Sequence, residues 1–487
     1  MNHPASYAGK DVVILGLARS GVAVAKLFHE LGARVIVNDQ KTLDQCPEAA
    51  PLTALGISVV TGGHPDTLIH PGVALVVKNP GIPYKIAPIQ EAIRLGIEIV
   101  TEVEVASLIC QAPIIGITGS NGKTTTTTWV GDILREAGLS PIIAGNIGRA
   151  LCEAAEEATP DDWMVVELSS FQLKGTSRFR PRIACLLNIS EAHLDYHGSM
   201  DDYIESKAKL FANQTAEDTA VLNWDDPTCR ILIERGSVKG RLMPFSIRER
   251  LPRGVYIEPP LAAGEALTER HMLVARGVPG GAAANDPEAD TGLVELVSAL
   301  QLGIPGRHNA ANALAAAAIA LAAGASVEAI RAALQAFRGV EHRLELVKQV
   351  NGVTFYNNSK ATNALATITA LESFRQPVVL IAGGKERGSH YTELLPLFKD
   401  RVRAVVALGE TRQKFADVAA KAGITRVKTV DTANSAADTL RSAVDTAYAF
   451  AEPGDVVLLS PACASWDMFE SYEERGRIFK QSVHNLV

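Results

Sequence analysis

A glycine-containing loop directly after an apolar segment is the feature that most constrains the fold of this chain. The loop spans 117–125, follows the apolar run 112–116, and continues into a run of threonines that opens a predicted helix, Thr125 to Leu134. A buried strand that turns in this way into a helix presents backbone N–H groups to phosphate oxygens. Ile117 occupies the first glycine position of the longer pattern, so the short G-x-x-G-K-T form remains.

This loop predicts an ATP or GTP site rather than a plain strand-to-helix turn. In this interpretation the lysine adds a positive charge beside the phosphates, and the first threonine holds Mg²⁺ through its hydroxyl. The residues predicted to bind the nucleotide are Gly119, Ser120, Asn121, Gly122, Lys123, Thr124 and Thr125.

Strand and helix patterns alternate along the whole chain. A length of 487 residues corresponds to about three domains of ~150 residues each. Short apolar, β-branched runs closed by polar residues are typical of parallel strands buried on both faces; they occur at 34–39, 163–168, 183–189, 219–223, 378–382 and 402–408.

We therefore predict an α/β fold of three domains, each with a mainly parallel doubly wound sheet. The predicted domains are a Rossmann-like domain over 1–101, a central P-loop domain over 102–339 and a second Rossmann-like domain over 340–487. Glycine and proline pairs between 247 and 293 predict a surface excursion with local hairpins and an exposed loop around 279–290.

Composition excludes several classes of function. The net charge of −7, from 54 acidic and 47 basic residues, gives no basic footprint for nucleic acid. The six cysteines lie far apart, which argues against a zinc site and a disulfide framework. The N-terminus lacks a signal-peptide pattern, and the alanine-rich tract 310–325 predicts a packed helix. We expect a cytoplasmic protein with no membrane partner.

A second glycine motif, Gly16 to Gly21, follows the first predicted strand and resembles an NAD fingerprint, with Asp39 closing the next strand. In the NAD fingerprint the middle glycine lets the backbone approach the pyrophosphate. Ala18 stands at that position here, so NAD binding is disfavoured. Two alternatives remain from these residues. The turn packs a helix on the sheet, or it binds another nucleotide diphosphate whose base or sugar donates to Asp39.

Two further polar residues end strands of the central block. Glu167 closes the strand 164–167, and His193 follows the strand 183–189. Taken separately, each is typical of an ordinary solvated side chain. Because the carboxyl ends of parallel strands share one edge, both are expected near Lys123, where they could hold Mg²⁺ beside the γ-phosphate.

The ordered set of motifs resembles the Mur ligase family over essentially the whole chain, from Gly16 to Tyr472. Two of the motifs, 359–363 and 460–465, resemble the branch of the family that adds D-glutamate. The motifs are Gly119-Ser-Asn-Gly-Lys-Thr124, Gly145-Asn-Ile-Gly148, Glu167-Leu-Ser-Ser-Phe-Gln172, His193-Leu-Asp195, Gly306-Arg-His-Asn309, His342-Arg343, Ser359-Lys-Ala-Thr-Asn363 and Ser460-Pro-Ala-Cys-Ala-Ser465.

The resemblance implies ATP-driven amide formation in cytoplasmic peptidoglycan precursor synthesis. ATP would phosphorylate the carboxylate of UDP-N-acetylmuramoyl-L-alanine, and the amine of D-glutamate would attack the acyl phosphate. It implies two Mg²⁺ ions, one held by Thr124 and Glu167 and one by His193 and a carbamylated Lys207. The implied catalytic residues are Lys123, Glu167, His193 and Lys207.

The remaining implied contacts divide among the substrates. ATP would also contact Asn309, Arg343 and Asn358. The UDP moiety would lie near Leu17, Ala18, Arg19, Ser20 and Asp39, and the muramoyl part near Asn146, Ser169, Gln172 and His193. D-glutamate would contact Lys360, Thr362, Arg387, Ser465 and Tyr472.

Three positions depart from or vary within the family pattern, and other functions remain open. Asn358 replaces the usual aspartate, Arg387 replaces a frequent lysine with Lys385 close by, and Tyr472 could equally be phenylalanine. A sibling ligase for another amino acid or a folate polyglutamylating relative would lack the 460–465 motif. A nucleotide-switched binding protein would not need a second metal site. We expect a monomer.

Overall fold

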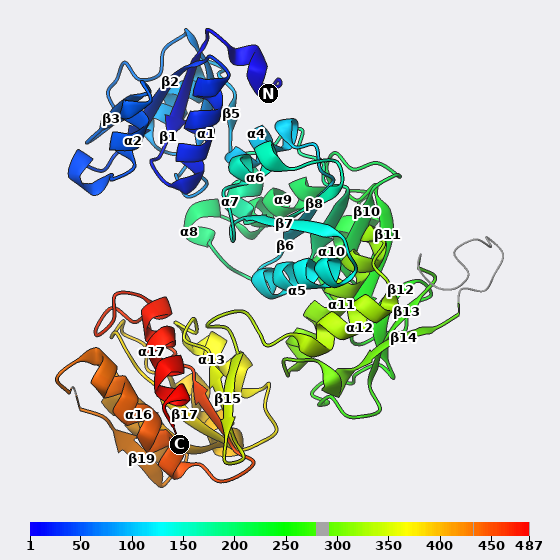
Figure 1. The fold of residues 1–487 in the computed structure, drawn as a ribbon, viewed down its shortest axis with the longest axis vertical. Helices are drawn as coiled ribbons and strands as arrows, with labels where there is room; N and C mark the ends of the chain where they lie inside the picture. The colour runs from blue at the N-terminus through cyan, green and yellow to red at the C-terminus, as the bar shows by residue number, and fades with distance from the viewer. Residues whose placement is uncertain (279–291, 432, 487) are drawn as a thin grey trace. The chain divides into compact units, whose positions relative to one another are not determined.

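The computed structural model describes residues 1–278, 292–431 and 433–486 (Figure 1). The chain forms two compact units. The first unit comprises Met1–Ala299 and Ala311–Leu334, and the second comprises Leu300–Ala310 and Gln335–Val487. The first unit contains two sheets and the second contains one.

The first sheet has five parallel strands in the order β3-β2-β1-β4-β5. Its helices α1 and α2 pack in one hydrophobic cluster, and α3 packs in another. The strands are β1 (Asp11–Leu15), β2 (Arg34–Asp39), β3 (Ser58–Thr61), β4 (Val73–Lys78) and β5 (Ile99–Val100). The helices are α1 (Arg19–Glu30), α2 (Ala49–Ala54) and α3 (Ala87–Arg94), and α4 (Glu102–Ile109) follows β5.

The central sheet has nine strands in the order β14-β13-β12-β11-β10-β9-β6-β8-β7. The strands are β6 (Ile114–Thr118), β7 (Ser140–Gly145), β8 (Asp162–Glu167), β9 (Ile183–Leu186), β10 (Thr219–Asn223), β11 (Arg241–Ser246), β12 (Gly254–Glu258), β13 (Met272–Arg276) and β14 (Val294–Ser298). The helices are α5 (Lys123–Glu136), α6 (Leu151–Glu157), α7 (Ser170–Lys174), α8 (Leu194–His197), α9 (Met200–Ala208), α10 (Pro227–Glu234), α11 (Arg307–Ala323) and α12 (Val327–Ala336).

The third sheet has the order β15-β16-β20-β17-β18-β19, and only β15 runs antiparallel to its neighbour. The strands are β15 (Glu345–Val350), β16 (Val353–Asn357), β17 (Val378–Ala382), β18 (Val402–Ala407), β19 (Arg426–Thr429) and β20 (Val456–Leu459). The helices are α13 (Ala364–Leu371), α14 (Leu395–Arg401), α15 (Arg412–Lys421), α16 (Ala436–Phe450) and α17 (Tyr472–His484).

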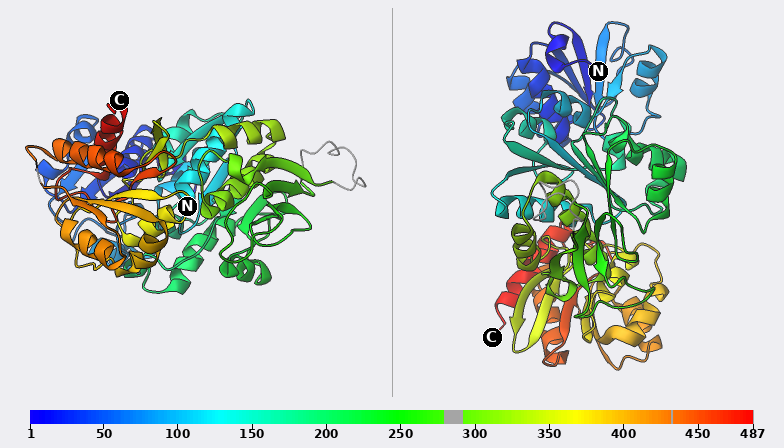
Figure 2. Two further views of the ribbon diagram at one scale, coloured as in Figure 1. Left: turned by 90° about the horizontal axis from the view of Figure 1, so that it is seen from below. Right: turned by 90° about the vertical axis from the view of Figure 1, so that its right-hand side faces the viewer.

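The third sheet illustrates why such apolar runs form doubly wound sheets. Leu380 of β17 packs in the cluster with α13 to α15, whereas Val379 and Ile381 pack in the cluster with α16 and α17. Successive side chains of a strand point to opposite faces, so a continuous apolar run requires helices on both sides. Helices lie on both faces of this sheet (Figure 2).

The prediction of an α/β fold with three mainly parallel sheets is confirmed. The surface excursion predicted between 247 and 293 is wrong in part, because β12 and β13 lie in the nine-stranded sheet. β12, β13 and β14 form its antiparallel end, because β13 pairs antiparallel with β12 and β14 pairs antiparallel with β13. The loop predicted around 279–290 lies outside the described residues.

The alanine-rich tract is a packed helix, as predicted, because its residues 313–321 are buried in α11. Within the described part of the chain, none of the helices combines the length and apolarity that crossing a bilayer would require.

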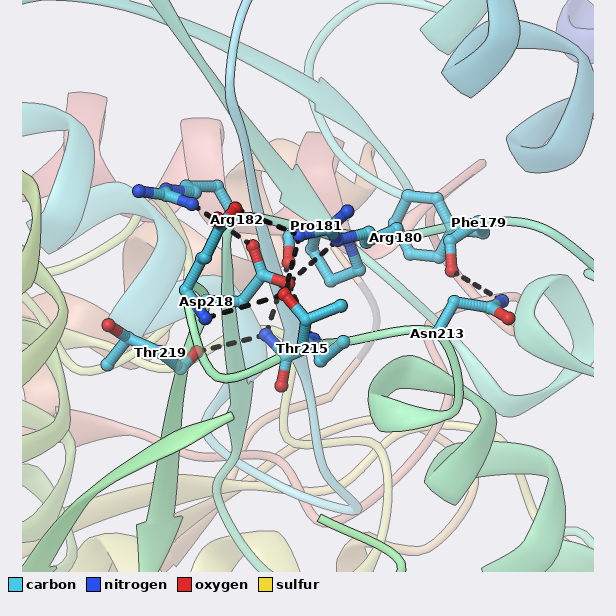
Figure 3. Close-up of polar contacts among 10 residues, drawn as sticks. Phe179, Arg180, Pro181, Arg182, Asn213, Thr215, Asp218 and Thr219 are labelled. Atoms are coloured by element: carbon cyan, nitrogen blue, oxygen red, sulfur yellow. Dashed lines mark hydrogen bonds and ion pairs between the residues drawn. The ribbon is translucent and has the colours of Figure 1, made fainter. Parts of the chain in front are cut away.

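A buried polar network joins the amino-terminal ends of β9 and β10 (Figure 3). The carboxylate of Asp218, 2% exposed, accepts hydrogen bonds from Arg180 Nε (2.7 Å) and from the backbone N–H of Thr215 (2.8 Å). Burial opposes ionisation of this carboxyl, but the hydrogen bond from Arg180 and the others lower its pKa overall. The network lies at the end of the strands opposite the phosphate loop.

We expect Asp218→Asn to lower the free energy of unfolding by about 2 kcal/mol at pH 7, because charge-assisted hydrogen bonds are lost. Because the pKa of Asp218 is lower in the folded than in the unfolded protein, its carboxylate stabilises the fold fully above the unfolded-state pKa of about 3.9. This stabilisation is lost as the pH falls through the folded-state pKa. Urea unfolding should therefore show a smaller difference in the free energy of unfolding between wild type and Asp218→Asn at pH 3 than at pH 7. Glu217→Gln is the matched control, since Glu217 is 79% exposed and 3.8 Å from Arg180.

Candidate active site

The phosphate loop connects β6 to α5 and is fixed by the segment that follows β9. Asn188 accepts the N–H of Asn121 through Oδ1 (2.9 Å) and the N–H of Ser120 through its carbonyl (2.9 Å). Lys123 Nζ donates to the carbonyls of Gly119 (3.0 Å) and Ser120 (3.1 Å). The loop is thus a preformed turn with a cation folded over it, as an anion site requires.

Gly122 cannot be replaced without disturbing this turn. It caps α5 in the left-handed region with φ 83°, and a Cβ atom there would lie 2.3 Å from Asn312 Oδ1. Thr124 and Thr125 follow in the first turn of α5, where both are buried. The sequence prediction of a glycine turn feeding a helix therefore matches the local geometry.

Lys207 of α9 lies beneath the loop and is 2% exposed. Its Nζ donates to the carbonyl of Gly119 (2.9 Å) and to Thr118 Oγ1 (3.2 Å). Burial, and then the positive charge of Lys123, lower the pKa of Lys207 to about 6, while Glu167 opposes the shift. The amine is therefore largely neutral at pH 7, the state in which a lysine is nucleophilic.

Glu167 ends β8 at the same edge of the sheet and is 1% exposed. Its Oε1 accepts a hydrogen bond from Asn146 Nδ2 (2.7 Å). Its other oxygen, Oε2, is buried and has no hydrogen-bond partner among the residues that the structure describes. A buried, unpartnered carboxylate oxygen is costly unless a cation binds it. Since oxygen is the ligand that Mg²⁺ prefers, this atom fits the metal that the sequence implies.

His193 precedes α8 and lies near the same cations. Its backbone adopts the left-handed region with φ 57°, which is uncommon for a residue other than glycine and occurs often at functional sites. Its exposed ring lies 4.9 Å from the ring of Phe171. Partial desolvation and the charge of Lys123 lower its pKa, so that the neutral imidazole, the form that ligates metals, is favoured.

Tyr203 is a residue of this site that the sequence analysis missed. It is 1% exposed, its hydroxyl lies 2.8 Å from Ser120 Oγ, and its ring lies 4.9 Å from Lys207 Nζ. The available signal was its position four residues before Lys207, which places both side chains on one face of α9.

The structure gives three predicted substrate contacts a local structural role. Ser169 and Gln172 form a capping box at the start of α7, with Gln172 Oε1 accepting from the Ser169 N–H (2.9 Å). Asn146 donates to Glu167, as described above. These bonds orient the side chains beside Glu167 and use part of their hydrogen-bonding capacity.

The turn after β1 is organised by Asp39. Its carboxylate accepts the N–H of Leu17 (2.7 Å) and the N–H of Lys41 (2.9 Å). Ser20 Oγ donates to Asn79 (3.0 Å), and Arg19 donates to the carbonyl of Gly148 (2.8 Å). Ala18 caps α1 without a side-chain bond. The structure thus groups the residues predicted for the UDP moiety at the carboxyl edge of the first sheet.

A cavity of about 670 Å³ lies beside α3 and is lined by residues such as His64 and Arg94. None of the described residues that the sequence implicates lines it.

The second unit has a cavity of about 440 Å³ lined by Thr362, Arg387 and Cys463. Three other residues predicted for D-glutamate do not line this cavity in the described part of the chain. Lys360 Nζ lies 5.0 Å from the ring centre of Tyr472, and Ser465 is 2% exposed. Ala462, on the cavity wall, has φ 57°.

The predicted ATP contacts Asn309, Arg343 and Asn358 also belong to the second unit. Asn358 bridges two segments, since its Nδ2 donates to Ser460 Oγ (3.1 Å) and its Oδ1 accepts the N–H of Leu344 (3.2 Å). Asn309 donates to the carbonyl of Pro305 (2.6 Å). The amide of Asn358 therefore ties the 460–465 motif to the segment that contains Arg343.

Arg475 is a second residue that the sequence analysis missed. Its guanidinium is fully buried and donates to Ser359 Oγ (3.0 Å), the Ser359 carbonyl (2.8 Å) and the Cys463 carbonyl (3.1 Å). It thus joins the two motifs that flank the cavity. No spacing in the sequence distinguishes it from the surrounding charged residues of α17.

Comparisons with known proteins find family models for three successive parts of the chain. Three family models match: "Mur ligase MurD-like, N-terminal domain" over residues 10–101, "Mur ligase middle domain" over 117–256 and "Mur ligase, glutamate ligase domain" over 342–463.

Two curated relatives are both named UDP-N-acetylmuramoylalanine--D-glutamate ligase. That of Geobacillus kaustophilus (strain HTA426) is 47% identical over 481 residues, covering 99% of this chain and 98% of the relative. That of Geobacillus sp. (strain WCH70) is 46% identical over 487 residues, covering 100% of both.

Solved structures share the fold. A MurF from Acinetobacter baumannii aligns with a TM-score of 0.56 at 21% identity, covering 88% of this chain and 87% of that one. MurF from Thermotoga maritima, solved in complex with ADP, aligns with a TM-score of 0.52 at 16% identity, covering 99% and 96%. At these identities the likeness concerns the fold alone.

Proposed function

Because the chain belongs to the Mur ligase family, we propose that it is an ATP-dependent ligase that joins D-glutamate to UDP-N-acetylmuramoyl-L-alanine in peptidoglycan synthesis. The choice of D-glutamate rests on the full-length identity to ligases named for that amino acid. The observation in the structure that supports ligase chemistry best is the grouping of the phosphate loop, Glu167 and the neutral amine of Lys207 at one sheet edge.

The reaction proceeds in two transfers. A carboxylate oxygen of the alanyl group attacks the γ-phosphorus of ATP, so that ADP leaves and an acyl phosphate forms. The amine of D-glutamate then attacks the acyl carbon, the amide bond forms, and inorganic phosphate leaves with the former carboxylate oxygen. The protein needs to align these groups and stabilise spreading negative charge, rather than form a covalent bond itself.

The residues of the loop supply that stabilisation. The N–H groups of Ser120 and Asn121 are bonded to Asn188, so the other backbone N–H groups of 119–124 and the ammonium of Lys123 would face the β- and γ-phosphates. Thr124 and Glu167 would hold one Mg²⁺, and His193 with a carbamylated Lys207 would hold a second. Bound Mg²⁺ would shield the phosphate charge and polarise the γ-phosphoryl group.

Carbamylation of Lys207 is consistent with its surroundings. A neutral amine adds to CO₂, the N–C bond forms and one proton is released, which leaves a carbamate anion. The pKa of about 6 makes the neutral amine available at pH 7. The product offers oxygen donors to a hard cation, which an ammonium cannot do.

We assign the substrates to the three predicted domains. Domain 1–101 binds the UDP moiety, domain 102–339 binds ATP, and domain 340–487 binds D-glutamate. Asn309, Arg343 and Asn358 complete the ATP contacts. Asn146, Ser169 and Gln172 contact the muramoyl part, and Lys360, Thr362, Arg387, Ser465 and Tyr472 contact D-glutamate. We place the enzyme in the cytoplasm as a monomer, which light scattering of the purified protein tests.

Phosphate release with one amino acid varied at a time tests the proposal. With ATP, Mg²⁺ and UDP-N-acetylmuramoyl-L-alanine, D-glutamate should support release, whereas L-glutamate, L-alanine and a diamino acid should not. Equal turnover with a diamino acid would indicate a sibling ligase instead. Release that needs neither the UDP substrate nor an amino acid would favour a nucleotide-switched protein.

A further inference from the structure

An arginine and an exposed tryptophan stack beside the cavity of the second unit. The guanidinium carbon of Arg387, which lines the cavity, lies 4.7 Å from the ring centre of Trp466. Trp466 is 67% exposed and directly follows the 460–465 motif. Leu365, which is 68% exposed, lines the same cavity.

The charges around the cavity distinguish Arg387 from its neighbours. Lys385, the other cation of the cavity wall, is paired with Glu410 at 2.8 Å. Glu386 is paired with Lys414 at 2.8 Å. Arg387 makes no ion pair with any carboxylate of the described residues. Its charge is therefore available to a ligand, whereas that of Lys385 is already compensated.

We propose that Trp466 is a positioning residue that holds the Arg387 guanidinium for one carboxylate of the incoming amino acid, and so contributes to the preference for a dicarboxylic substrate. This inference rests on the function proposed above. A guanidinium whose face lies on an aromatic ring keeps its in-plane N–H donors free for a bidentate bond with a carboxylate. Stacking also removes rotamer freedom before the ligand binds, which lowers the entropic cost of binding.

Two exposed apolar side chains, Leu365 on the cavity wall and Trp466 over Arg387, act in the same direction. Trp466 and Leu365 would exclude water from the ion pair once the amino acid is bound, and an ion pair is stronger where the dielectric constant is lower. The inference therefore concerns the KM for the amino acid. It does not concern phosphoryl transfer, which takes place at the loop of the first unit.

Steady-state kinetics of the full chain test the inference. Trp466→Ala should raise the KM for D-glutamate about tenfold, as expected for loss of a partly desolvated cation–π contact and the order it imposes. The kcat and the KM for ATP should stay within about twofold of wild type. Trp466→Phe should restore most of the affinity, whereas Trp466→Leu, apolar but without a π system, should behave like the alanine variant.

A double-mutant cycle separates positioning from a direct contact. In an Arg387→Ala background, Trp466→Ala should raise the KM no further, because Trp466 acts through the guanidinium. The control is Trp224→Ala, which removes a similar stack on Arg230 (5.2 Å) in the first unit and should leave the KM for D-glutamate unchanged.

Two outcomes would overturn the inference. One is an unchanged KM for D-glutamate in Trp466→Ala. The other is a KM in the double variant that rises by the full product of the factors measured for Trp466→Ala and Arg387→Ala alone. A wild-type protein that shows no phosphate release with D-glutamate would instead overturn the proposed function, and the inference with it. The wild-type measurement therefore distinguishes the two failures.

Discussion

Replacing Lys207 with alanine is expected to lower kcat by about 10² or more, a loss of roughly 3 kcal/mol of transition-state stabilisation. The substitution removes the amine that can add CO₂ and so become an anionic oxygen ligand. Lys207→Arg should be no better, because a guanidinium does not take up CO₂. Phosphate release gives kcat, and far-UV circular dichroism shows whether the fold is intact.

The rescue of the alanine variant makes this test specific. Acetate or formate should restore part of the activity, since a small carboxylate can occupy the space of the carbamate. Lys209→Ala is the matched control on the same segment, because Lys209 Nζ donates to the carbonyls of Lys174 (2.6 Å) and Thr176 (3.0 Å) rather than to the phosphate loop. Near wild-type activity of Lys207→Ala or Lys207→Arg would refute the carbamate role.

Glu167→Gln is expected to lower kcat by at least about 10² and to raise the Mg²⁺ concentration for half-maximal activity by at least about tenfold. The substitution keeps the shape of the side chain and can keep the bond to Asn146, but it replaces a charged oxygen ligand with a neutral amide. A Mg²⁺ titration of phosphate release measures both quantities.

Glu136→Gln provides the control for this titration, because Glu136 is exposed at the far end of α5. It should leave the Mg²⁺ dependence unchanged. If Glu167→Gln also titrates like wild type, the buried Oε2 atom is not a metal ligand, and its lack of a partner needs another explanation.

The fold was largely predictable because buried parallel strands have a strong sequence signal. The predicted strands at 34–39, 219–223 and 378–382 match β2, β10 and β17. The strands that the pattern missed include β15 and β19, which lie at the edges of the third sheet. β19 reads Arg-Val-Lys-Thr and has exposed residues. An edge strand needs only one apolar residue in two, so its pattern resembles that of a loop.

The site was predictable where a residue's place follows from a strand end, and less so where tertiary contacts decide. Glu167 and the phosphate loop follow from β8 and β6. In contrast, the capping role of Gln172 depends on the helix start at Ser170, and Arg475 bonds to Ser359, which lies 116 residues away in the chain. The lowered pKa of Lys207 likewise depends on burial that no local pattern encodes.

The most direct test of the account follows the oxygen atoms of the substrate. UDP-N-acetylmuramoyl-L-alanine labelled with ¹⁸O in both oxygens of its alanyl carboxylate is incubated with the protein, ATP, Mg²⁺ and D-glutamate, and the released phosphate is analysed by mass spectrometry. An acyl phosphate intermediate predicts one ¹⁸O atom in each phosphate released and one in the amide product. Phosphate free of ¹⁸O would mean that water attacks ATP directly, and would contradict ligase chemistry at this site.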